Sequence, residues 1–246
     1  MARTIQETRA SDSIGEAART RKPVLYMETI EAYNRWAELT LDTIEMQQLL
    51  PQLLDKVAAN PQTDAVKLVD LGCGTGRNTR QLLRLASEDA HIIGLDTSPG
   101  MLDVARMAID NEKESHASLS NAVSLEIYDL LQSPPAPPFF EGLAALMRPG
   151  GYFLLTNMHS EMGSISQVGF VDAATETKIR PTSYPHTIAD VLKAAEKVGF
   201  VVEELNGERV RERKVDETMV GELGKRAQKW IGITVWFAIC FRKRLW

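Results

Sequence analysis

The sequence has little cysteine and no long apolar run. Its two cysteines, Cys73 and Cys240, cannot form the disulfide framework of a small secreted domain, so we expect a reducing compartment, the cytoplasm. The longest apolar stretch, residues 231–241, is too short to cross a bilayer as a helix. Residues 1–23 lack the apolar core of a secretory signal. These absences argue against a disulfide scaffold and a membrane protein.

The chain also has no excess of positive charge. The 246 residues include 28 Lys and Arg against 33 Asp and Glu, which gives a net charge of −5. This balance argues against a protein that binds nucleic acid through its overall charge. No His-x-x-x-His pair is present and the cysteines lie far apart, so we expect no metal site. The length and the 44% hydrophobic content suit one α/β domain.

Strand and helix patterns alternate along most of the chain. We expect strands at 66–71, 91–95, 123–128, 152–156, 200–205 and 233–241, and helices at 77–86, from 98 onward, 139–147, 187–198 and 217–230. Ser98 before Pro99, and Thr187 three residues before Asp190, are typical helix starts. Such alternation predicts an α/β fold with a mainly parallel sheet and helices on both faces.

The N-terminal part has a different character. Residues 1–23 show no periodicity and are expected to form an arm, whereas residues 26–59 follow a helical pattern that we expect Pro51 to break. We therefore divide the chain into an arm with a helical lid, residues 1–60, and an α/β domain, residues 61–246.

The most informative stretch is the glycine loop, residues 72–76, which joins an apolar strand to a helix. Gly72, Gly74 and Gly76 allow a tight turn and close approach to a ligand, at the point where nucleotides bind in open α/β sheets. Their G-x-G-x-G spacing differs from the G-x-G-x-x-G of a pyrophosphate site. Asp70, two residues before the loop, would repel a diphosphate and suits an ammonium group. An NAD-dependent oxidoreductase is therefore the less favoured alternative.

Two further carboxylates end the next strands of the predicted sheet. Asp96 ends the second strand and could accept hydrogen bonds from ribose hydroxyls. Asp129 ends the third strand and could accept one from an adenine amino group. Together with Asp70, these positions fit an adenosine that carries an amino-acid tail and no phosphates.

At this point the sequence resembles the class I S-adenosylmethionine-dependent methyltransferases. The matching stretches are VDLGCGTG (69–76), GLDTSPGML (94–102), IYDL (127–130) and LMRPGGYFLLTN (146–157). The resemblance implies S-adenosylmethionine as cofactor and a Rossmann-like sheet with an antiparallel C-terminal strand. It implies that the cofactor is bound by Asp70, Gly72, Gly74, Gly76, Asp96, Thr97, Met101, Tyr128 and Asp129. Met101 would pack on the adenine, although a methionine on a helix face is also an ordinary core residue.

A weaker resemblance concerns residues 33–37, 184–187 and 230–242, which are similar to fungal small-molecule methyltransferases of natural-product pathways. It implies a secondary metabolite as acceptor, bearing a thiol or a hydroxyl. A thiol with a pKa of about 8.5 is partly ionised near neutral pH and needs little help from a base. The oligomeric state stays open.

Several side chains are candidates for the acceptor side. His159, which follows a strand together with Asn157, and His186, which precedes a helix cap, are the candidate catalytic residues. Their alternative roles are a solvated loop histidine and a hydrogen bond to the backbone or the cap. Tyr33 and Trp36 would lie on the lid and exclude water, unless they serve helix packing alone.

One departure from the resemblance concerns the fourth strand of the sheet. Only residues 130–138 separate Asp129 from the helix that begins at Phe139, and four of them are proline. Proline lacks the donor that a central strand requires, so we expect the fourth strand to be missing. The alternative function is therefore a non-catalytic protein that binds the cofactor or a partner protein without turnover.

Overall fold

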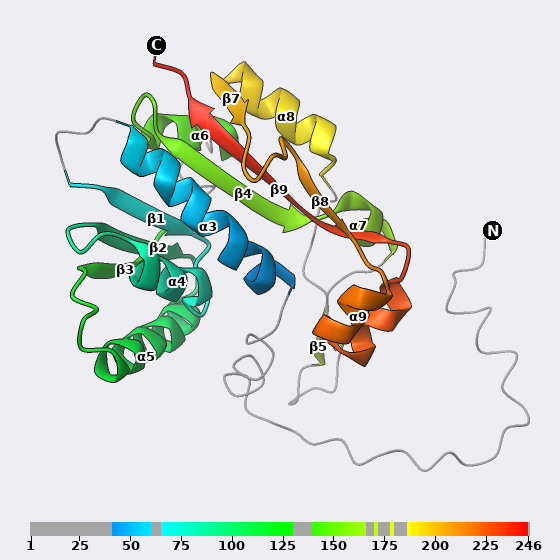
Figure 1. The fold of residues 1–246 in the computed structure, drawn as a ribbon, viewed down its shortest axis with the longest axis horizontal. Coiled ribbons are helices and arrows are strands. Elements are labelled where there is room, and N and C mark those ends of the chain that lie inside the picture. Colours follow the sequence, from blue (N-terminus) through cyan, green and yellow to red (C-terminus); the bar gives the residue numbers. More distant parts are fainter. Residues whose placement is uncertain are drawn as a thin grey trace, which may run out of the picture.

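The computed structural model describes residues 41–60, 65–129, 139–165, 170–171, 178–179 and 186–245 (Figure 1). The predicted lid residues Tyr33 and Trp36, and the proline-rich residues 130–138, lie outside this part. The strands are β1 (Lys67–Leu71), β2 (His91–Asp96), β3 (Val123–Ile127), β4 (Tyr152–Met158), β5 (Phe170–Val171), β6 (Lys178–Ile179), β7 (Phe200–Glu203), β8 (Arg211–Lys214) and β9 (Thr234–Lys243). The helices are α3 (Leu41–Ala59), α4 (Arg77–Leu85), α5 (Pro99–Ser115), α6 (Phe139–Leu146), α7 (Ser160–Ile165), α8 (Ile188–Lys197), α9 (Glu217–Leu223) and the 3-10 helix η1 (Lys225–Trp230).

The described strands form a parallel sheet and an antiparallel sheet, and β5 and β6 form a separate two-stranded antiparallel sheet. The parallel sheet has the order β1-β2-β3. In the antiparallel sheet, β9 pairs with β4 on one side and with β7 and β8 on the other. The predicted α/β class, with a parallel portion and an antiparallel C-terminal strand, is confirmed.

Strand β9 carries the core of the antiparallel sheet because it is buried on both faces. Trp236, Ala238 and Cys240 belong to the apolar cluster that includes Leu49 of α3. The alternate residues Phe237, Ile239 and Phe241 pack against α6 and α8. Since successive side chains of a strand point to opposite faces, this continuous apolar run fits a strand covered on both sides.

Among the described strands, β1 is an edge strand of the parallel sheet. In the part of the chain that the structure describes, β1 pairs only with β2, and β4 pairs only with β9. Val69, in the middle of β1, is 53% exposed although an apolar residue in an inner strand is normally covered. This arrangement fits the expected absence of a fourth strand between the two sheets.

Helix α3 contacts β4 and β9 of the antiparallel sheet and also α4 of the parallel half, and Figure 1 shows it between the two sheets. Met46 and Leu50 join the cluster that contains Leu83 of α4 and Ile92 of β2, whereas Leu49 packs with Trp236 of β9. The expected break at Pro51 is wrong, because α3 runs without interruption through it. An interior proline costs about 3 kcal/mol, and burial of each leucine returns about 1.5–3 kcal/mol, so packing holds the helix together.

The other predicted boundaries are mostly close. The cap at Ser98 is confirmed, since its hydroxyl accepts from the Met101 amide at 3.4 Å, and the cap at Thr187 accepts from the Asp190 amide at 3.1 Å. The single helix predicted over 217–230 is wrong: it divides at Gly224 into α9 and η1. Gly224 has φ = 84°, a left-handed value that ends an α-helix. The predictions also omitted α7, β5, β6 and β8.

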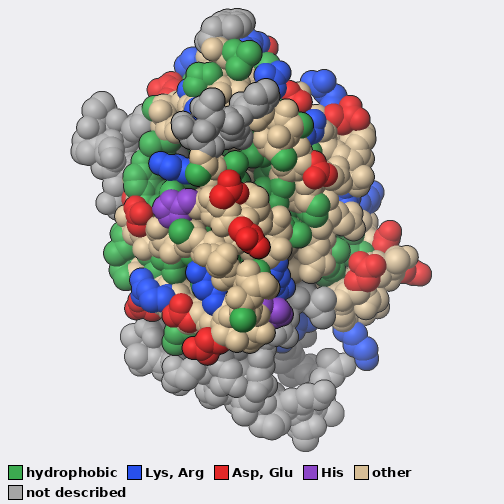
Figure 2. Space-filling model, turned by 60° about the vertical axis from the view of Figure 1, so that its left-hand side comes forward, with side chains coloured by type: hydrophobic (Ala, Val, Ile, Leu, Met, Phe, Trp, Pro, Cys, Tyr) green, Lys and Arg blue, Asp and Glu red, His purple; other side chains and the backbone are tan. Residues whose placement is uncertain are grey.

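The surface in Figure 2 bears charged side chains of both signs among apolar and neutral ones, and the coloured part of this face shows no broad basic patch. None of the helices within the described ranges is long and apolar enough to cross a membrane.

Candidate cofactor and acceptor site

The glycine loop lies between the end of β1 and the start of α4, as predicted. Gly72, Gly74 and Gly76 have φ values of 76°, 53° and 78°, which other residues adopt only with strain. A methyl group built on Gly72 or Gly74 would meet nothing within 4 Å, so the loop is bordered there by open space. On Gly76 it would lie 3.0 Å from Cβ of Ala105. The first two glycines thus leave room for a ligand, and the third allows α4 and α5 to pack closely.

Asp96 connects the loop to the end of β2. Its Oδ2 accepts a hydrogen bond from the Gly74 amide at 2.9 Å, and its Oδ1 accepts one from the Ser98 amide at 2.9 Å. Each carboxylate oxygen can accept a second hydrogen bond. The backbone therefore fixes the carboxylate and leaves it able to bind two adjacent hydroxyl groups, as a ribose presents.

Asp70, in β1 two residues before the loop, contacts the first turn of α4, and its predicted contact with the cofactor stays a prediction. Its Oδ2 accepts from the hydroxyl of Thr79 at 2.6 Å. Burial raises the pKa of the Asp70 carboxyl, while hydrogen bonds from the side chain and backbone of Thr79 and the charge of Arg77 act in the opposite direction. Thr79 lies in the first turn of α4, where backbone amides have no partner in the helix. Asp70 thus supplies the cap that Gly76 cannot.

Cys73 is a buried thiol within the loop. Burial and the nearby carboxylates of Asp70 and Asp96 raise its pKa to about 12. The thiol therefore stays protonated near neutral pH and has little nucleophilic character. Its small size is enough to explain its place in the loop.

The remaining predicted cofactor residues lie at the same edge of the parallel sheet. Thr97 is exposed and Met101 is half-buried on α5, so the contact of Met101 with adenine stays a prediction. Tyr128 and Asp129 follow β3, and the Tyr128 amide donates to the Asp96 carbonyl at 3.0 Å. The structure thus brings Asp96 and the end of β3 together.

On the acceptor side, His159 follows β4 and both of its ring nitrogens have neighbours. Nδ1 accepts from the Glu161 amide at 3.1 Å, and Nε2 lies 3.3 Å from Oε1 of Glu212. This arrangement suits the neutral ring with its proton on Nε2. To accept a proton from a substrate, His159 would first have to leave one of these neighbours.

The surroundings described for the other acceptor-side candidates, His186 and Asn157, are local and do not include His159. His186 is exposed and directly precedes Thr187, the cap of α8. Asn157 is exposed, and its side chain accepts from the amide of Met158. Within the described ranges, no group of three or more His, Cys, Asp or Glu side chains could hold a metal ion.

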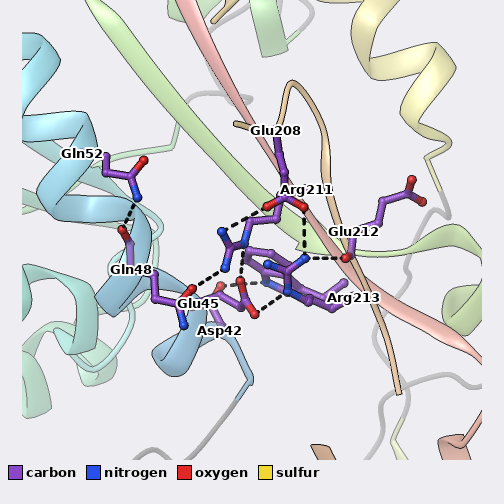
Figure 3. Close-up of polar contacts among 9 residues, drawn as sticks. Asp42, Glu45, Gln48, Gln52, Glu208, Arg211, Glu212 and Arg213 are labelled. Atoms are coloured by element: carbon purple, nitrogen blue, oxygen red, sulfur yellow. Dashed lines mark hydrogen bonds and ion pairs between the residues drawn. The ribbon is translucent and has the colours of Figure 1, made fainter. Parts of the chain in front are cut away.

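Sequence reasoning missed a buried network of charges at the start of α3 (Figure 3). Glu45, 4% exposed, accepts from Nε of Arg211 at 2.5 Å and from Nε of Arg213 at 2.6 Å. Arg211 also contacts Glu208 and Gln48. One turn earlier, Asp42 binds Arg77 and Trp236. The only local signal was the alternation of Arg211 and Arg213, which places both on one face of a strand.

Comparisons with known proteins agree with the motifs. The family described as "Methyltransferase domain" matches residues 68–151. An uncharacterized methyltransferase of Emericella nidulans is 47% identical, and the alignment covers 87% of this chain and 90% of the relative. A ubiquinone biosynthesis O-methyltransferase of Xanthomonas campestris pv. campestris is 24% identical, over 68% of this chain and 74% of its own length.

Among solved structures, a geranyl diphosphate methyltransferase in complex with GPP and sinefungin has a TM-score of 0.53 at 14% identity, over 83% of this chain and 79% of that one. This likeness concerns the fold. The alignment with the Emericella nidulans relative is longer, at 259 positions, than the 246 residues of this chain. The relative therefore has residues inside the aligned region at places where this chain has none, which agrees with a missing segment.

Proposed function

The chain belongs to the class I S-adenosylmethionine-dependent methyltransferases, with S-adenosylmethionine as cofactor, and on this basis we propose that it methylates a thiol or hydroxyl of a small secondary metabolite. The cofactor supplies a methyl group already activated on a sulfonium. The protein then has to bind the two substrates in line and exclude water.

The main support for a cofactor site at this edge of the sheet is the carboxylate of Asp96, which is held in place. Two backbone amides, from Gly74 and Ser98, hold it at the edge where β1 and β2 end. We propose that Asp96 binds the ribose hydroxyls, that Gly72 and Gly74 admit the methionine end, and that Asp129 contacts the adenine amino group. The open space at Gly72 and Gly74 supports this assignment.

For the acceptor, we propose a small molecule in a cytoplasmic setting, without nucleic acid or membrane as partner. The mixed charges in Figure 2 support this choice. A thiol acceptor would ionise without a strong base, which agrees with the engaged ring of His159. A hydroxyl acceptor would require His159 or His186 to take its proton. The Xanthomonas campestris relative is an O-methyltransferase, which supports the hydroxyl alternative.

A second candidate function is favoured by the edges of β1 and β4 that have no partner strand among the described residues. A protein that lacks the strand between them could bind the cofactor, or a partner protein, without methylating an acceptor. Binding would then depend on the parallel sheet alone, which contains the glycine loop, Asp96 and Asp129.

Two measurements separate these functions. Calorimetry with S-adenosylhomocysteine and with NAD tests the cofactor, and saturable binding of NAD alone would exclude both proposals. Incubation with methyl-labelled S-adenosylmethionine and a panel of thiols, phenols and amines then tests transfer. Label on a thiol or a phenol supports the enzyme, whereas tight cofactor binding without any transfer supports the second function.

A further inference from the structure

Asp42, in the first turn of α3, connects two parts of the fold. One is the cofactor half, which consists of the parallel sheet β1–β3 with α4 and α5, and the other is the antiparallel sheet. Its Oδ2 accepts from Nη2 of Arg77, and its Oδ1 accepts from Nε1 of Trp236 at 3.0 Å. Trp236 lies on β9 and is 6% exposed. Both oxygens of the carboxylate are therefore held by donors from two different parts of the fold.

The partner of Asp42 lies beside the proposed cofactor site. Arg77 is the first residue of α4 and follows Gly76 of the glycine loop directly. Both members of the pair act on Asp70 in β1: the charge of Arg77 lowers the pKa of the Asp70 carboxyl, and the charge of Asp42 raises it. Because Arg77 directly follows the loop and Asp42 is paired with it, both charges lie next to the loop.

The sign of that potential matters for a methyltransferase. S-adenosylmethionine carries a sulfonium and has one more positive charge than S-adenosylhomocysteine, the product that must leave after each transfer. The positive charge of Arg77 beside the loop, without the negative charge of Asp42, would disfavour the cationic donor relative to the neutral product. When a carboxylate is paired with the guanidinium, the two opposite charges largely cancel, and the pair changes the electrostatic potential at the ligand only a little.

We propose that Asp42 is a positioning residue that sets the preference of this site for S-adenosylmethionine over S-adenosylhomocysteine, by holding Arg77 and cancelling its charge. The inference rests on the proposed cofactor site. It explains why a carboxylate of the segment before the α/β domain reaches the start of α4, and it gives the donor an advantage in replacing the product.

The test compares the dissociation constants of the two ligands at low ionic strength by calorimetry. Asp42→Asn keeps the shape and an acceptor for Trp236 but removes the charge. We expect it to raise the ratio of the S-adenosylmethionine constant to the S-adenosylhomocysteine constant by about threefold to tenfold. Arg77→Met should lower this ratio, and the double variant should return it toward the wild-type value. The exposed Asp55 on α3 provides the control: Asp55→Asn removes the same charge and should leave the ratio unchanged.

A purely structural role would weaken both ligands equally in Asp42→Asn, and an unchanged ratio would overturn the inference. Added salt should reduce the effect only in part, because partly covered charges such as these are screened less than exposed ones, for which the screening length is about 10 Å at 0.1 M. If the wild-type protein binds neither ligand, the proposed function itself fails. If it binds both and only the ratio in the variants does not move, the inference alone fails.

Discussion

The two sheets differ in how their strands are supported. Strand β9 of the antiparallel sheet is paired on both edges and covered on both faces, and Phe237 at its centre is 0% exposed. Within the described ranges, strand β1 of the parallel sheet is paired on one edge alone, and Val69 is 53% exposed. The strand that leads into the proposed cofactor site is therefore the less protected one. The most deeply buried strand thus lies in the antiparallel sheet, whereas the proposed cofactor site lies at the edge of the parallel sheet.

The largest effect is expected from Phe237→Ala, which leaves a cavity between β9 and the helices α6 and α8. Truncation of a buried phenylalanine costs about 3–5 kcal/mol. Chemical denaturation should show this loss of unfolding free energy. A loss below about 1 kcal/mol would mean that β9 is not the centre of the core.

Asp96→Ala tests the cofactor half. We expect binding of S-adenosylhomocysteine to weaken by about 1–3 kcal/mol, because charge-assisted hydrogen bonds to the ligand are lost. Calorimetry measures the change. Asp103→Ala is the control, since this carboxylate lies on the exposed surface of α5 and pairs only with Arg106 among the contacts described for it. Unchanged affinity in Asp96→Ala would contradict the ribose assignment.

Alanine substitutions at two glycines, one in each half of the molecule, compare the cost of a side chain at positive φ. Gly76→Ala and Gly199→Ala each place a side chain at positive φ, 78° and 90°, which costs about 1–2 kcal/mol. Gly76→Ala should cost more, because its methyl group would lie 3.0 Å from Ala105, whereas that of Gly199 meets nothing within 4 Å. Denaturation curves of both variants measure the difference. Equal losses would show that helix packing at the loop is not tight.

The pH dependence of stability tests the environment of Asp70. Burial raises its pKa in the folded state above the ordinary value of 3.8. The stability it contributes is thus present at low pH and is lost as the pH rises through the folded pKa. Relative to the wild type, Asp70→Asn should gain unfolding free energy from acid to neutral pH, in the absence of ligand. A difference that falls with rising pH would show that the ionised form is favoured.

The smallest effect is expected from Val69→Thr in β1. Because the side chain is already 53% exposed, the unfolding free energy should change by no more than about 0.5 kcal/mol. Thermal and chemical denaturation test this. A loss comparable to that of a core residue would show that another strand covers β1 in solution.

Much of the cofactor half could be predicted because its determinants are local. The three glycines, the cap at Ser98 and the carboxylates at the strand ends lie within one stretch of chain, and their spacing fixes both the turn and the edge at which they meet. The apolar run of β9 likewise predicts a strand buried on both faces. The break of the last helix at Gly224 was available in the sequence but lay inside a plausible helical pattern.

What the sequence by itself determined is the α/β class, the glycine loop with its acids, and the shortage of residues before Phe139. Only the tertiary structure decided that α3 continues through Pro51, that Glu45 lies between Arg211 and Arg213, and that Asp42 reaches Arg77. These contacts join residues far apart along the chain, and no local spacing encodes them. From the sequence alone, a single carboxylate on a helix is expected to be solvated. Whether it is buried, and which side chains contact it, depends on how the helices and sheets pack.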